Sequence, residues 1–145
     1  MKPFSRRHFL KAGAAAGVLA GMGSVPLLAE RGKATDWVTL GQSGMQVTRL
    51  AFGTGTHGGS VQRNLGQDTF TSLGRHAYDS GIRFLETSET YDGMHEMLGI
   101  ALTGIPQESY LLMTKVTTGT GQGPQTTIDE LRRLAQTDYF AVLLL

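Results

Sequence analysis

The feature that most constrains the fold of this 145-residue chain is a regular alternation of apolar and amphipathic segments after residue 48. The apolar segments begin about 30 residues apart, which is the length of a strand and a helix together. Between the first two, Phe70, Leu73 and Ala77 recur at helical spacing. Continuous apolar strands that alternate with amphipathic helices predict an α/β fold whose parallel sheet is covered on both faces.

The strand-like segments predict a sheet of four strands, preceded by a hairpin. We expect strands over residues 49–52, 82–85, 110–114 and 140–145, and a hairpin over residues 37–47. Such a sheet fits either a doubly wound fold or half of a (β/α)8 barrel. The chain ends inside its most apolar strand, so we expect it to be truncated there.

Each helix between these strands has a sequence signal for where it begins or ends. Asp68 is expected to cap the first helix and Gly81 to close it. The second helix is expected to end before Gly104. Thr127 and Glu130 have the spacing of a capping box, which predicts the start of a third helix.

Residues 1–34 have the features of an export signal followed by a linker, and residues 35–145 form the expected domain. A basic start that includes the adjacent Arg6 and Arg7 precedes a weakly apolar run rich in alanine and glycine. The paired arginines favour the twin-arginine route, with an ordinary secretory signal or an uncleaved anchor as the alternatives. We expect a periplasmic or exported protein that uses the twin-arginine export machinery and meets the membrane only through an uncleaved signal. Because this route carries folded proteins, it favours a cofactor-dependent enzyme.

The composition excludes several kinds of site. The chain has no cysteine, which rules out disulfides, thiolate metal sites and a lipidated cysteine in this stretch. After residue 34 it has seven basic and eleven acidic residues, so we expect no basic patch for nucleic acid. His57, His76 and His95 lack the spacing of metal ligands, and no metal site is expected.

Gly53–Gly58 match the glycine spacing of a dinucleotide-binding loop directly after a predicted strand. Such a loop opens a helix at once, so that the helix N-terminus holds the pyrophosphate. Here residues 59–67 intervene, and the acidic residue expected about 20 positions on falls at Asp79, inside a predicted helix. A small Rossmann-type nucleotide binder is therefore the weaker hypothesis, and a flexible loop is favoured.

Three ionisable residues, Glu86, Tyr91 and Lys115, stand at or just after the ends of two successive predicted strands. In a barrel, the C-terminal strand ends carry the active site. An ammonium stabilises a phenolate, so a lysine beside a tyrosine makes the phenol a better proton donor, and a carboxylate keeps the lysine charged. Spacing alone leaves open a structural Glu–Lys ion pair beside a half-buried tyrosine.

The region from Val38 to Leu145 resembles the aldo/keto reductase superfamily in several ordered segments. The matching segments are Thr48–Thr54, Gly81–Thr87, Tyr91, Leu98–Leu102, Thr114–Val116 and Asp138–Tyr139. The resemblance implies the N-terminal half of a (β/α)8 TIM barrel, preceded by a β-hairpin that closes its bottom. It also implies an oxidoreductase that reduces a small carbonyl substrate with NADP(H), or alternatively with NAD(H).

The same resemblance implies roles for individual residues. Tyr91 aligns with the family's proton-donating tyrosine, Lys115 with the lysine beneath it, and Glu86 with the position of an aspartate. Thr54 and Gly55 are the expected cofactor-binding residues of this stretch. The family's histidine would come after the last residue, so we expect residues 1–145 alone to be inactive. The glutamate in place of aspartate leaves a second hypothesis, a non-catalytic binding or redox-sensing protein on the same fold.

Overall fold

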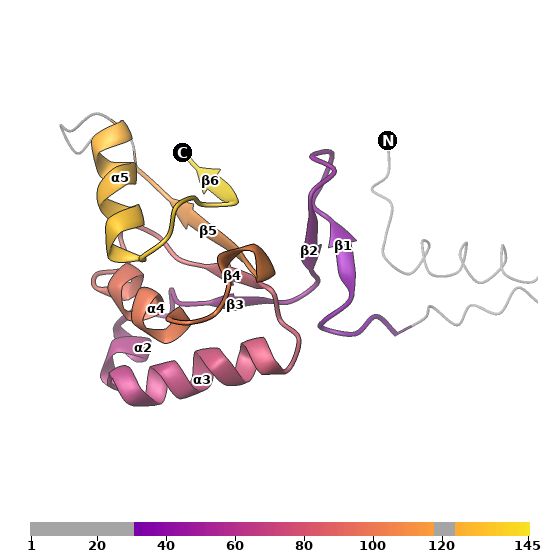
Figure 1. Cartoon of the computed structure of the whole chain (residues 1–145), viewed down its shortest axis with the longest axis horizontal. Coiled ribbons are helices and arrows are strands. Elements are labelled where there is room, and N and C mark those ends of the chain that lie inside the picture. Colours follow the sequence, from indigo (N-terminus) through magenta and orange to yellow (C-terminus); the bar gives the residue numbers. More distant parts are fainter. Residues whose placement is uncertain (1–30, 118–123) are drawn as a thin grey trace, which may run out of the picture. The chain divides into compact units, whose positions relative to one another are not determined.

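The structure is a computed structural model that describes residues 31–117 and 124–145 (Figure 1). Residues Gly32–Leu145 form one compact unit. Its centre is a parallel sheet in the order β3-β4-β5-β6, whose strands are Ala51–Gly53, Phe84–Glu86, Leu111–Lys115 and Val142–Leu144. The predicted α/β fold with a parallel sheet is confirmed, and each strand begins and ends within two residues of its expected place.

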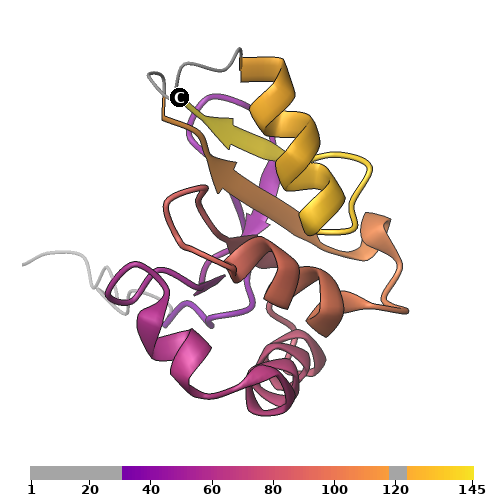
Figure 2. The same cartoon turned by 90° about the vertical axis from the view of Figure 1, so that its left-hand side faces the viewer.

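The helices of the repeat lie together on one side of the sheet. In Figure 2, α4 (Met94–Leu102) and α5 (Pro124–Leu134) lie in front of the strands, and α3 (Gln67–Asp79) lies below them. Adjacent helices contact one another, α3 with α4 and α4 with α5. In the described ranges none of these three helices covers the opposite face, which decides between the two architectures that the sequence pattern left open. Helices on one side are the arrangement of half a (β/α)8 barrel, because a doubly wound sheet places them on both.

The hydrophobic core lies between these helices and the sheet. Phe70, Leu85, Met94 and Leu98 are each at most 2 % exposed. Met94 and Leu98 are four residues apart on α4, so they share the face that meets the strands. Burial of this stripe supplies the main driving force for docking α4, since each fully buried side chain of this size contributes roughly 1.5–3 kcal/mol.

The predicted hairpin is confirmed and is joined to the N-terminal end of the sheet. β1 (Trp37–Thr39) and β2 (Gln46–Thr48) pair antiparallel. The Thr48 side chain is buried, and its hydroxyl accepts hydrogen bonds from the backbone N–H groups of Arg83 and Phe84, each at 3.1 Å. It also donates to the carbonyl of Leu50 at 2.9 Å. One hydroxyl therefore connects the hairpin, the start of β3 and the start of β4.

Helix α3 begins and packs differently from the prediction. Gly66 is its N-cap, and Asp68 lies inside the first turn without a side-chain cap bond, so the predicted cap is wrong. A carboxylate in the first turn still interacts favourably with the helix dipole. Leu73 is 44 % exposed, because Gly74 takes the buried position beside α4. Gly81, with φ of 97°, follows the helix end as predicted.

Helix α5 begins three residues before the predicted capping box. Its first residue is Pro124, whose fixed φ suits the first position of a helix. Thr127 therefore lies within the helix, and the predicted capping box with Glu130 is wrong. The Glu130 carboxylate instead accepts two hydrogen bonds from the Arg133 guanidinium, at 2.6 and 3.1 Å, one turn along the helix.

Candidate active site

The ends of β4 and β5 bring the three predicted residues together. Lys115 Nζ donates to the hydroxyl of Tyr91 at 2.7 Å and forms an ion pair with Glu86 Oε1. The Tyr91 hydroxyl is also 3.5 Å from Glu86 Oε1, the outer limit of a hydrogen bond. The lysine is therefore the close partner of the phenol, and the carboxylate is the close partner of the lysine.

The loop between β4 and α4 holds Tyr91 against the end of β5. The backbone N–H of Thr87 donates to the carbonyl of Met113 at 2.9 Å, and that of Glu89 to the carbonyl of Lys115 at 3.0 Å. The Glu89 carboxylate accepts hydrogen bonds from both the backbone N–H and the hydroxyl of Thr117. These bonds extend the pairing of β4 and β5 past the strand ends. They therefore fix the position of the loop from which the Tyr91 side chain extends.

Lys115 is charged in this setting. Burial lowers the pKa of Lys115, but the hydrogen bonds and charges of Glu86 and Tyr91 together outweigh it, so the net direction is upward. The side chains of Lys115 and Glu86 remain 33 % and 17 % exposed. The site therefore presents an ammonium, a carboxylate and a phenol at a partly open edge of the sheet, a set that can donate a proton and stabilise the phenolate that remains.

The loop after β3 lies on the other side of the tyrosine. The buried hydroxyl of Thr54 donates to the carbonyl of Glu86 at 3.0 Å, so it joins β3 to β4 directly beneath the site. Gly55 lies directly against the Tyr91 ring. Contact of Thr54 or Gly55 with a cofactor stays a prediction.

A short helix follows the glycine loop where none was expected. α2 (Ser60–Asn64) begins directly after Gly59, whose φ of 83° places it in the left-handed region that favours glycine. The Arg63 guanidinium on α2 donates to the carbonyls of Gly58 at 3.1 Å and Asp92 at 2.6 Å. Arg63 therefore links the loop after β3 to the loop that carries Tyr91, a role that its place in the sequence did not indicate.

His95 is a buried polar residue near the site, whereas the sequence analysis considered it only as a possible metal ligand. Its ring is 3 % exposed, and Nε2 lies 2.9 Å from the hydroxyl of Thr114, the residue before Lys115. Burial lowers the pKa of His95 to about 4, against a smaller upward effect of the Glu89 charge. The ring also meets Phe140 edge-on, with centroids 6.0 Å apart. The sequence contained a signal for this burial, because His95 lies three positions before the core residue Leu98, which is the spacing of residues on one face of a helix.

A pocket of about 160 Å³ opens beside the Tyr91 loop, between the start of α4 and α5. It is lined by Glu89, Tyr91, Asp92, Gly93, His95, Glu96, Leu131 and Leu134. The acidic rim gives this pocket a negative character. In the described part of the chain, no group of three or more His, Asp or Glu side chains is placed to hold a metal ion.

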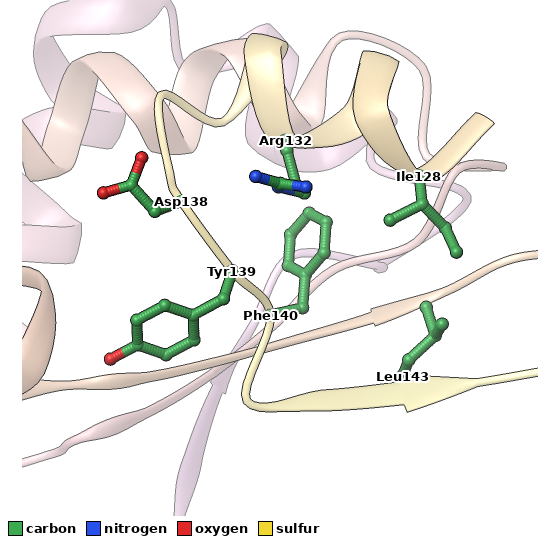
Figure 3. Close-up of a pocket in the computed structure, with 6 residues that line it drawn as sticks. All are labelled: Ile128, Arg132, Asp138, Tyr139, Phe140 and Leu143. Carbon is green, nitrogen blue, oxygen red and sulfur yellow. The ribbon is translucent and has the colours of Figure 1, made fainter. Parts of the chain in front are cut away.

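A second pocket, of about 220 Å³, lies between α5 and β6 (Figure 3). It is lined by Ile128, Arg132, Asp138, Tyr139, Phe140 and Leu143. None of these residues belongs to the cluster of Glu86, Tyr91 and Lys115, so this pocket is separate from the candidate active site.

The N-terminal segment matches the twin-arginine translocation pathway signal sequence over residues 3–23. This confirms the predicted signal, which directs the protein through the twin-arginine pathway to the periplasm. The structure of residues 1–30 lies outside the described residues. Among the helices that are described, none has both the length and the apolar character needed to cross a membrane.

Three solved structures of similar fold are described as aldo-keto reductases, two of them as putative ones. A "putative aldo-keto reductase" from Pseudomonas aeruginosa is 25 % identical with a TM-score of 0.61, covering 79 % of this chain and 48 % of its own. A second structure from that organism is 24 % identical with a TM-score of 0.63, covering 79 % and 47 %. A thermostable aldo-keto reductase in complex with the inhibitor epalrestat is 21 % identical with a TM-score of 0.61, covering 74 % and 41 %. The chain thus spans about half the length of these structures.

The sequence itself supports the same grouping. No protein of curated function matches it significantly. The pattern of the aldo/keto reductase family, however, matches residues 49–145, which hold all four parallel strands and the three clustered side chains. By this match over most of its length, and by the half-barrel fold it shares with the solved reductases, the chain belongs to the aldo/keto reductase family.

Proposed function

We propose that this protein carries the proton-donating side of a nicotinamide-dependent carbonyl reductase, with Tyr91 as the proton donor. The observation that carries the proposal is the 2.7 Å contact between Lys115 Nζ and the Tyr91 hydroxyl, beside the Glu86 carboxylate. As a carbonyl carbon gains a hydride, its oxygen becomes basic and takes the phenol proton. The Lys115 ammonium then stabilises the phenolate, and Glu86 keeps the lysine charged and oriented.

The cofactor proposed for this reaction is NADP(H), with NAD(H) as the alternative. When bound, it supplies the hydride. The phenol and ammonium at the strand ends fit its reacting end, because they offer a proton next to a place where a carbonyl oxygen can lie. Of the two residues expected to contact the cofactor, Thr54 donates its hydroxyl to the carbonyl of Glu86. The backbone around Gly55 is therefore the remaining candidate for a cofactor contact. We therefore propose that the described residues meet the nicotinamide end of the cofactor, and we assign none of them to its phosphates.

Residues 1–145 alone are proposed not to turn over substrate. They correspond to about half of each solved relative. The other half of a barrel closes the sheet and forms the rest of the mouth into which the strand ends point. An isolated half leaves that mouth open to water, which weakens every electrostatic interaction in it.

The test uses the product of the complete reading frame, whatever its length. NADPH oxidation is followed with a panel of aromatic and aliphatic aldehydes and ketones. Wild type should reduce at least one class, and Tyr91→Phe should lower kcat by roughly 10²–10⁴-fold, because it removes the general acid. Tyr139→Phe, which removes a hydroxyl from an exposed tyrosine, is the control. Equal turnover of wild type and Tyr91→Phe would sink the proposal.

A second function, non-catalytic binding or redox sensing on the same fold, is favoured by one contact. Glu86 Oε1 approaches the Tyr91 hydroxyl to 3.5 Å while it also binds Lys115, so the carboxylate competes for the phenol proton. Glu86→Asp shortens the side chain by one methylene and removes this competition. A large gain in turnover supports a tuned enzyme. Saturable NADPH binding without turnover in either form supports the binding protein.

The boundary between signal and domain is also a proposal. We place the signal and linker at residues 1–34 and the mature domain at residues 35–145. N-terminal sequencing of the exported protein checks this boundary, and a mature protein that begins within the strand at Trp37 contradicts it.

A further inference from the structure

Gly55 lies closer to the Tyr91 ring than any other residue type would permit. A Cβ atom built on Gly55 would lie 2.5 Å from Tyr91 Cζ and 2.6 Å from both Cε2 and the hydroxyl oxygen. Real Cβ atoms essentially never come within 3.0 Å of another heavy atom in this way. The ring of the proposed proton donor thus rests directly on the backbone of the loop after β3.

The glycine is required here by space and not by backbone conformation. Gly58 and Gly59 in the same loop have φ of 63° and 83°, in the region that favours glycine. Gly55 is not among the residues with positive φ. An alanine at position 55 can therefore adopt the backbone conformation, and the three atoms nearest its methyl group all belong to the Tyr91 ring and its hydroxyl.

The tyrosine ring is held by contacts at both ends. Its hydroxyl accepts a hydrogen bond from Lys115 at 2.7 Å, and the ammonium lies 4.7 Å from the ring centroid. The Tyr91 backbone N–H is bound to the carbonyl of Ser88 at 3.0 Å. A methyl group at position 55 must push the end of the ring, which carries the hydroxyl, away from its place on the lysine.

We propose that Gly55 is a positioning residue: its missing side chain lets the Tyr91 ring rest on the loop after β3, and this contact holds the phenol hydroxyl on Lys115. The consequence for catalysis rests on the proposed function. The consequence for the geometry of Tyr91 and Lys115 does not, so the two can be tested apart.

Gly53, the last residue of β3, supplies a matched control two positions before Gly55. A Cβ atom on Gly53 would lie 3.4 Å from Glu86 Oε2, an ordinary van der Waals distance. Like Gly55, Gly53 is absent from the residues with positive φ. Gly53→Ala and Gly55→Ala therefore add the same methyl group at two positions beside the site, and only one of them contacts the phenol.

The experiment measures the acylation rate of Lys115 in the 145-residue chain by mass spectrometry, together with urea unfolding. Gly55→Ala should raise the labelling rate several-fold, because Lys115 loses its contact with the phenol, and Tyr91→Phe should give a comparable increase. Gly53→Ala should label at the wild-type rate. Because neither readout requires turnover, a failure of the proposed reductase function leaves this test intact.

If Gly55→Ala folds poorly, the same substitution is tested in a protein that already carries Tyr91→Ala. In Tyr91→Ala, which removes the ring, Gly55→Ala should change neither the unfolding midpoint nor the labelling of Lys115. Two results overturn the proposal: wild-type labelling in the Gly55→Ala single variant, or an equal loss of stability from Gly55→Ala with and without the Tyr91 ring. On the complete reading frame, Gly55→Ala should lower kcat by roughly tenfold or more, because the phenol leaves its place on the lysine.

Discussion

The two ends of the parallel sheet use polar groups in opposite ways. At the N-terminal end, the Thr48 hydroxyl is buried and all its bonds go to backbone atoms. At the C-terminal end, Glu86, Tyr91 and Lys115 bond to one another and stay partly open. The first arrangement holds elements together, and the second leaves charged groups available to a ligand. The same strands therefore carry structural hydrogen bonds at one end and the proposed catalytic groups at the other.

The largest expected effect breaks the C-terminal end. Lys115→Met removes the cation that stabilises the phenolate, so kcat of the complete reading-frame product should fall by roughly 10²–10⁴-fold. The free energy of unfolding should change by no more than about 1 kcal/mol, since the ion pair is partly exposed. Turnover assays and urea unfolding measure both. Arg133→Met, which breaks an exposed ion pair on α5, is the control. If Lys115→Met lost stability but kept its turnover, the distinction between the two ends of the sheet would be wrong.

The next effect concerns His95, which is buried beside Thr114 near the C-terminal end of the sheet. Its pKa in the fold is about 4, below the ordinary 6.5, so below pH 6.5 the unfolded chain binds a proton that the folded chain does not. The stability that neutral His95 provides is complete above pH 6.5 and is lost as the pH falls toward 4, by about 3 kcal/mol at most. Urea unfolding across this range measures the slope. His95→Gln should flatten it, and the same slope in both proteins would contradict the assignment.

A smaller effect breaks the N-terminal end. Thr48→Val keeps the shape of the side chain but leaves the N–H groups of Arg83 and Phe84 without their acceptor. The free energy of unfolding should fall by about 1–3 kcal/mol, the usual cost of buried unsatisfied groups. Turnover per folded molecule should stay at the wild-type value. A selective loss of turnover in this variant would show that the two ends are not independent.

The smallest effect lies at neither end. Glu130→Gln weakens the exposed pair with Arg133 on α5, and we expect no measurable change in the unfolding midpoint or in turnover. Thermal unfolding at low and at high salt checks this. A salt-dependent drop in the unfolding midpoint would contradict this expectation, because it would show that exposed charge pairs on the helices contribute measurably to stability.

Much of the fold followed from sequence periodicity, but the layer arrangement did not. The apolar strands and the hairpin were predictable because strand length and turn glycines are local properties. Whether the helices lie on one face or two was not, since an amphipathic helix has the same pattern in both architectures. Helix starts failed for a similar reason: Asp68 and Thr127 have the chemistry of caps, but Gly66 and Pro124 begin the helices.

The candidate site was predictable where it depends on side-chain chemistry at strand ends. Glu86, Tyr91 and Lys115 stood out because each is a functional group at the end of, or just after, an apolar segment. Gly55 was named only as an expected cofactor contact and Arg63 was given no role, because the contact of Gly55 with the Tyr91 ring and the bonds of Arg63 to two carbonyls depend on how distant loops meet. Such roles become visible only when the chain path is known.

The bridge made by Arg63 has a consequence for how this part of the protein can change over evolutionary time. Its guanidinium holds the carbonyls of Gly58 and Asp92, which belong to two different loops at the mouth of the site. An insertion that moves either carbonyl away from the guanidinium would break one of those bonds. We therefore expect each loop to accept a change of length only where both carbonyls keep their places.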